Sequence, residues 1–127
     1  MITPQGTRAQ RPKGEPTMKN TNENRQLLNR LSQLCEGTPY TLETGTYEET
    51  GNLYADLRTR FPADRFTPEM RLDERRGCFK IGVQTTAYGT QSAENILEIA
   101  SRLTIAANLA KALRLEIENA GYQVEGA

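Results

Sequence analysis

Two pairs of adjacent carboxylates, Glu48-Glu49 and Asp73-Glu74, come closest to a catalytic arrangement in this sequence. Paired acids can serve as general acid and general base when their surroundings separate their pKa values. Both pairs fall in predicted turns, where solvated charge is the ordinary reason for acidic residues. The chain also has no histidine, which removes the commonest general base and the His-activated nucleophiles. We therefore expect a protein that is not an enzyme.

Metal and cofactor sites are not indicated either. Histidine is the commonest zinc ligand, and the two cysteines, Cys35 and Cys78, do not form a CxxC pair. Buried free thiols are therefore the expected state of these cysteines, rather than a disulfide. The sequence contains no Walker loop, dinucleotide-binding glycine pattern or EF-hand loop. We expect no metal and no cofactor.

A basic strip is the first candidate binding site. Residues 53–80 hold seven basic and five acidic residues in a chain whose net charge is zero. On predicted strands, one side would carry Tyr54, Arg58, Arg60, Arg71 and Lys80. Cations that meet phosphates and a ring that stacks on a base are typical of single-strand nucleic-acid sites. Asp56 and Asp73 share that side, so a solvated face with cross-strand ion pairs is the interpretation we favour.

A second candidate site is the small polar segment Gly89-Thr90-Gln91-Ser92, which precedes a long predicted helix. The free amides of a helix start, together with the hydroxyls of Thr90 and Ser92, can hold a phosphate or carboxylate. Every helix start needs such residues for capping, however, and plain capping is the favoured interpretation here. A possible anion site at Gly89, Thr90 and Ser92 remains the alternative.

The long helix, predicted over 92–120, is the element that the rest of the chain must cover. Ser92 suits its N-cap, and Gly121 suits the left-handed position after its last turn. Its main apolar stripe repeats at three- and four-residue steps: Ile96, Ile99, Leu103, Ala106, Ala110, Leu113 and Ile117. A second line lies on roughly the opposite side: Leu97, Ile105, Leu109 and Leu115. Either the first helix or the tail packs there, or the line is a face for self-association.

The remaining pattern predicts an α+β domain. A capped apolar stripe indicates a helix over 20–36, with Gly37 as its stop. Alternation of apolar and polar residues predicts strands over 39–47, 53–61, around 70–73 and over 79–84, although 53–61 also fits helical spacing. The expected fold is an N-terminal helix, a four-stranded antiparallel meander and a long C-terminal helix packed on one sheet face.

The first 19 residues read as a disordered tail, because they combine prolines and glycines with almost no large apolar residue. Lys13-Gly14-Glu15 fits a purine-rich ribosome-binding site before a start codon at Met18, so residues 1–17 are interpreted as a possible translated leader from a bacterium, phage or plasmid. Residues 20–127 would form a single domain. No apolar run reaches the length of a membrane span and no signal peptide opens the chain, so we expect a cytoplasmic protein without a membrane partner.

These observations favour a small non-enzymatic binding or inhibitor protein that occupies a surface of a macromolecular partner, with another protein as the expected partner. One alternative is a nucleic-acid-binding module that uses the basic strip. The other is a structural homo-oligomer that uses the second line on the long helix.

Overall fold

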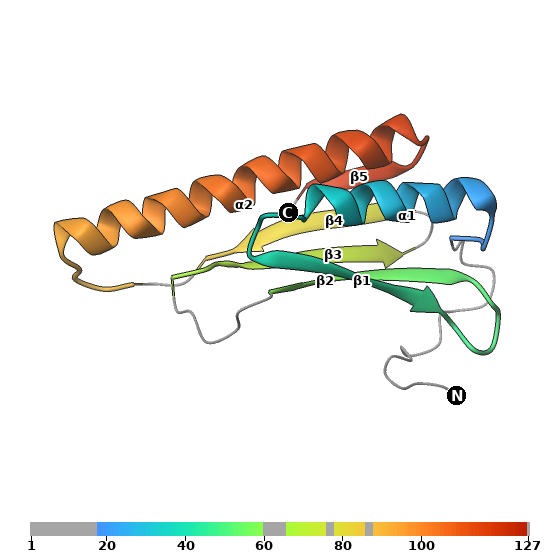
Figure 1. The fold of residues 1–127 in the computed structure, drawn as a ribbon, viewed down its shortest axis with the longest axis horizontal. Coiled ribbons are helices and arrows are strands. Elements are labelled where there is room, and N and C mark those ends of the chain that lie inside the picture. The colour runs from blue at the N-terminus through green and yellow to red at the C-terminus, as the bar shows by residue number, and fades with distance from the viewer. Residues whose placement is uncertain (1–17, 60–65, 76–77, 86–87, 127) are drawn as a thin grey trace.

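The helices of this protein lie on one side of its strands (Figure 1). The computed structural model describes residues 18–59, 66–75, 78–85 and 88–126. The elements occur in the order α1 (Asn22–Leu34), β1 (Tyr40–Thr46), β2 (Leu53–Thr59), β3 (Glu69–Arg75), β4 (Cys78–Gln84), α2 (Ala93–Asn119) and β5 (Gln123–Gly126). Helix α1 packs on β1 and β2, whereas α2 packs on β4 and β5. Within the described residues, helices thus cover one face of the strands and leave the opposite face open.

Both helices begin where capping chemistry predicts. Thr21 is the N-cap of α1 and its hydroxyl accepts from the Asn24 amide at 3.1 Å. Ser92 is the N-cap of α2 and accepts from the Asn95 amide at 3.1 Å. Helix α2 ends before Gly121, whose φ of +95° is a conformation that glycine adopts without a steric cost. The predicted helices over 20–36 and 92–120 are confirmed.

The predicted strands form, but the four-stranded meander is wrong. Strand β1 pairs antiparallel with β2, and β3 pairs antiparallel with β4. Strands β2 and β3 lie side by side (Figure 1), yet they belong to two sheets, one of two strands and one of three. Alternation along the chain defines the buried face of each strand, but it does not define which strand edges are joined by hydrogen bonds. The ambiguous segment is a strand over Leu53–Thr59, and its remaining residues lie outside the described ranges.

Strand β5 was not expected from the sequence. It follows α2 directly and pairs with β4 in parallel, with Phe79 opposite Val124. Parallel neighbours need a crossover connection, which α2 supplies here. A four-residue strand carries too little alternation to be recognised, and only its partner β4 makes it a strand.

The core lies between the helices and the inner face of the strands. Its largest fully buried side chains include Tyr40, Phe79, Leu31, Leu113 and Ile117. The ring of Tyr122 packs edge-on against Phe79 at 5.2 Å between centroids, and its hydroxyl donates to Asn24 Oδ1 at 2.7 Å. These contacts join the C-terminal strand, β4 and α1 into one packed unit.

Met18 already belongs to this core. Its side chain is 1% exposed, and its carbonyl accepts from the Leu53 amide at 2.8 Å. The predicted tail over 1–19 therefore extends too far at its C-terminal end. Residues 1–17, with the leader hypothesis, lie outside the described residues.

Candidate functional site

The open face of the strands carries most residues of the predicted basic strip. Inward residues such as Leu57, Leu72 and Ile81 are buried, and their chain neighbours therefore point to the other side. Arg58, Arg71 and Lys80 are all exposed there, on three different strands. The structure thus brings these three cations of the predicted strip onto one face, while Arg60 lies outside the described residues.

Tyr54 also lies on this side, but its ring is already used in packing. It stands opposite Gly45 in the β1–β2 register, and a Cβ atom built on Gly45 would lie 2.6–2.9 Å from the hydroxyl and ring of Tyr54. The ring also packs against Tyr47, with 5.4 Å between centroids. Tyr54 therefore fills the space that glycine leaves on β1, and stacking on a base would require it to leave that position.

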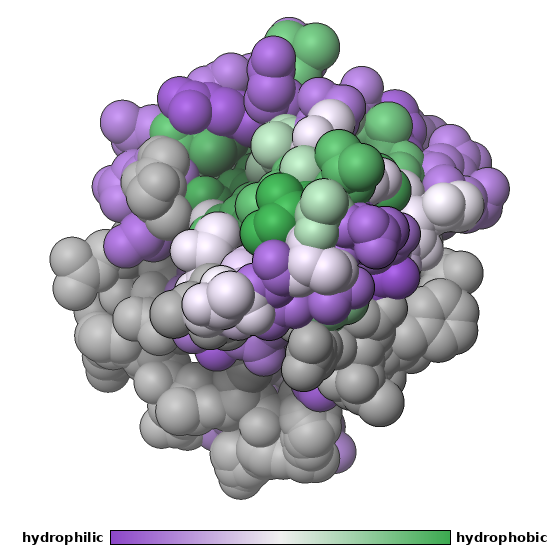
Figure 2. Space-filling view, turned by 90° about the vertical axis from the view of Figure 1, so that its left-hand side faces the viewer, coloured by the Kyte–Doolittle hydropathy of each residue, from purple (hydrophilic) through white to green (hydrophobic). Residues whose placement is uncertain are grey.

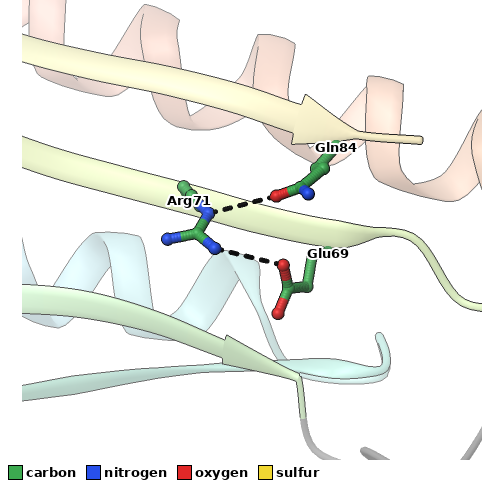
Figure 3. Close-up of polar contacts among 3 residues, drawn as sticks. All are labelled: Glu69, Arg71 and Gln84. Carbon is green, nitrogen blue, oxygen red and sulfur yellow. Dashed lines mark hydrogen bonds and ion pairs between the residues drawn. The ribbon is translucent and has the colours of Figure 1, made fainter. Parts of the chain in front are cut away.

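The cations of the strip have carboxylate neighbours. Arg58 pairs with Glu43 at 3.2 Å, and Arg71 pairs with Glu69 at 3.3 Å. Arg71 Nε also donates to Gln84 Oε1 at 3.3 Å, which ties β3 to β4 (Figure 3). These pairs are exposed, so each contributes only about 0–1 kcal/mol to folding. Their main effect is to neutralise positive charge on this face.

Among the side chains that the structure describes, the open face carries more negative than positive charge. Lys80 stands opposite Asp73 in one register and opposite Glu125 in the other. Among the described side chains, the face carries the carboxylates of Glu43, Asp56, Glu69, Asp73 and Glu125 against the cations of Arg58, Arg71 and Lys80. Backbone phosphates supply much of the affinity for nucleic acids and require a positive surface. The described part of the face therefore offers both signs of charge and no continuous positive surface.

A groove runs along the open face where the two sheets meet. It has a volume of about 540 Å³ and is lined by residues 56–59 of β2 and 69–73 of β3. A second hollow of about 280 Å³ lies between β3 and β4, where Gly82 faces Arg71 and has no side chain to fill the space. The sequence did not predict the groove, because it arises from the separation of β2 from β3.

The predicted anion site is occupied by capping contacts. The hydroxyl of Ser92 accepts from the Asn95 amide, and the side chain of Gln91 donates to the Tyr88 carbonyl at 2.5 Å. Asn95 in turn donates to Gln91 Oε1 at 2.9 Å. Gly89 and Thr90 are exposed beside these contacts. The geometry is that of a capped helix start, as the favoured interpretation proposed.

The predicted oligomer face is divided by the structure. Leu97, Ile105 and Leu115 are exposed, at 71%, 39% and 59%. Leu109 is 5% exposed and belongs to the core cluster. The four residues therefore do not form one external line, because Leu109 lies close enough to the main stripe to be covered by the sheet and α1.

Among the described residues, Tyr40 and Cys78 have shifted pKa values. Burial, followed by the nearby Tyr88, raises the pKa of Tyr40 to about 12, although Arg102 acts in the opposite direction. The Tyr40 hydroxyl donates to the Pro68 carbonyl at 2.6 Å. Partial burial and the nearby Glu125 raise the pKa of the Cys78 thiol, which disfavours the reactive thiolate. Both shifts favour the neutral form, and neither prepares a nucleophile.

Other kinds of site find no support among the described residues. Cys35 and Cys78 form no disulfide, and no group of three or more metal-ligating side chains occurs in this part of the chain. None of the described helices is long and apolar enough to cross a membrane. In the comparisons with known proteins, no family model, no curated protein and no solved structure matches this chain.

Proposed function

We propose that this protein is a non-enzymatic binding protein whose open strand face occupies a surface of another protein. The observation that carries the proposal is the groove of about 540 Å³ between β2 and β3, with acids and arginines alternating along both walls. An extended segment of a partner fits such a groove, and charge complementarity would set its register. Both helices pack on the other side of the strands, so nothing among the described residues covers this face.

Charge reversal on the two groove arginines tests this proposal. Arg58→Glu with Arg71→Glu changes both walls while leaving the buried residues untouched. The matched control is Arg114→Glu on α2, which is also an exposed arginine and pairs with Glu118 at 3.1 Å. Proteins that co-purify with the native chain are identified by mass spectrometry, and their affinities are then measured with purified components by calorimetry.

The expected result is one saturable protein partner that binds the wild type and the Arg114→Glu control alike. The double variant should lose at least about tenfold in affinity, since like charges facing each other across an interface cost several kcal/mol. If the partner binds the double variant as tightly as the wild type, the groove does not take part in binding and the proposal is wrong.

The nucleic-acid alternative is tested with the same variants. Labelled single-stranded DNA and RNA are titrated at low salt, where weak electrostatic binding is strongest. We expect no retention, because the described side chains of the face carry more carboxylates than cations. Salt-sensitive binding that the double variant abolishes would favour the nucleic-acid module instead.

A further inference from the structure

Helix α2 is apolar on two sides, whereas α1 is apolar on one. Helix α1 buries Leu27, Leu28 and Leu31 and turns polar residues to solvent. Helix α2 buries a full stripe that includes Leu109 and Leu113, yet its first half also exposes large apolar side chains. Figure 2, which looks onto the end of the molecule where α2 begins, shows hydrophobic surface gathered there between hydrophilic borders.

This second apolar region is a regular seam, here called the outer seam, and it consists of Ala93, Ile96, Leu97, Ala100, Leu103 and Ala107. Its alanines recur every seven residues, and Ile96 and Leu103 recur at the same interval between them. At 100° per residue the outer seam lies about 120° around the helix from the buried stripe. Its alanines are exposed, Ile96 is 49% exposed, and Leu103 is half-buried. A seven-residue repeat of this kind is typical of a helix that pairs with another helix.

We propose that the outer seam is the interface of a homodimer in which two α2 helices pack antiparallel. A two-fold axis near residues 101 and 102 brings Ala100 of one copy opposite Leu103 of the other. The same axis brings Ala107 opposite Ile96. In these two pairings a small side chain meets a large one, which is the condition for close interdigitation of two helices.

A second copy is the occupant that this geometry favours. Four of its six residues, Ile96, Ala100, Leu103 and Ala107, pair with one another under a two-fold axis, which is the requirement of an isologous interface. The outer seam contains no charged residue, so binding through it requires no opposite charge on the partner. With six residues on each copy, the interface is small beside the roughly 1,200–2,000 Å² of stable complexes, so we expect a weak and reversible dimer. The open strand face lies on the other side of the molecule and stays accessible.

Sedimentation equilibrium across a concentration series tests the homodimer. The wild type should dimerise reversibly, and Ala100→Glu should raise the dissociation constant by about a hundredfold or more, because a charge would be buried without a partner. Ala107→Glu should act in the same direction. Ala100 and Ala107 are exposed and glutamate is a good helix former, so circular dichroism should stay unchanged.

The matched control is Leu115→Glu. Leu115 is 59% exposed on the same helix but lies outside the outer seam, so its replacement should leave the dimer intact. A wild type that remains monomeric at about 1 mM overturns the proposal, since specific interfaces are far tighter than this. A folded Ala100→Glu variant that dimerises as the wild type does also overturns it, as does equal disruption by Leu115→Glu.

A distance between the two copies tests the antiparallel arrangement. A spin label introduced at Ala93→Cys, in a chain that also carries Cys78→Ser, reports the distance between the two copies. The proposed axis sets the two labelled positions about 26 Å apart along the helices, at 1.5 Å per residue. A parallel pair would hold them about 10 Å apart, at the spacing of two packed helices. The short distance would overturn the antiparallel interface.

Discussion

The buried hydroxyl of Tyr40 gives the sharpest prediction about stability. Tyr40 is fully buried, and its hydroxyl donates to the carbonyl of Pro68, which is also buried. The Tyr40→Phe variant removes the donor and leaves that carbonyl without this partner in the core. Loss of a partner for a buried polar group costs about 1–3 kcal/mol, and we expect that reduction in the free energy of unfolding at pH 8.

The same hydroxyl makes the difference in the free energy of unfolding between wild type and Tyr40→Phe depend on pH. Its pKa is about 12 in the folded protein and 10.0 for the unperturbed side chain. Between these values the unfolded chain releases a proton that the folded chain keeps, so stability is full below pH 10 and falls as the pH rises toward 12. The slope approaches about 1.4 kcal/mol per pH unit for one group. The Tyr40→Phe variant has no hydroxyl at this position and does not lose this stability. The difference in the free energy of unfolding between wild type and variant should therefore narrow from pH 10 upward.

Urea unfolding of both proteins at pH 8, 10 and 11 measures the gap directly. Every other titrating group is shared by the two chains, so the difference isolates Tyr40. A gap that stays constant from pH 8 to 11 would refute the argument that burial raises the pKa of this hydroxyl.

Three further substitutions follow from the packing. Gly45→Ala should lower the free energy of unfolding by about 1–3 kcal/mol, because the new methyl group would lie 2.6–2.9 Å from the hydroxyl and ring of Tyr54. Denaturant unfolding should show that most of this destabilisation disappears when Tyr54 is also replaced by Ala. Leu109→Glu should unfold the protein rather than dissociate it, since burying an unpaired charge costs several kcal/mol, whereas Leu115→Glu should keep its circular dichroism spectrum and melting temperature. Gly121→Ala should cost about 1 kcal/mol in thermal unfolding, through backbone strain alone, because nothing lies within 4 Å of the added carbon; an unchanged melting temperature would contradict this.

Local chemistry was enough to define most elements before the fold was known. Thr21 and Ser92 cap helices because a hydroxyl meets free amides within one turn, which is a property of neighbours in the chain. Alternation around Leu57 and Leu72 likewise defined the inner faces of strands. The helices and the first four strands therefore follow from residues a few positions apart. The absence of histidine follows from composition alone.

The candidate site could be predicted only in part. The placement of Arg58, Arg71 and Lys80 on one face follows from alternation within each strand. The partners that neutralise them do not, because Glu43 and Glu125 come from strands whose register no local pattern specifies. A strip that is basic along the chain therefore lies, among the described side chains, on a face with more carboxylates than cations once neighbouring strands are in place.

What the sequence by itself determined is the two helices with their caps, the first four strands and the side of each of these strands that enters the core, because these depend on spacings of two to four residues. What only the tertiary structure decided is how those elements combine. It placed β2 beside β3 in separate sheets, made a strand of Gln123–Gly126 and buried Leu109 while leaving Leu97 exposed. Each of these outcomes depends on contacts between residues far apart in the chain, and the free energy of such contacts is not encoded in any local period.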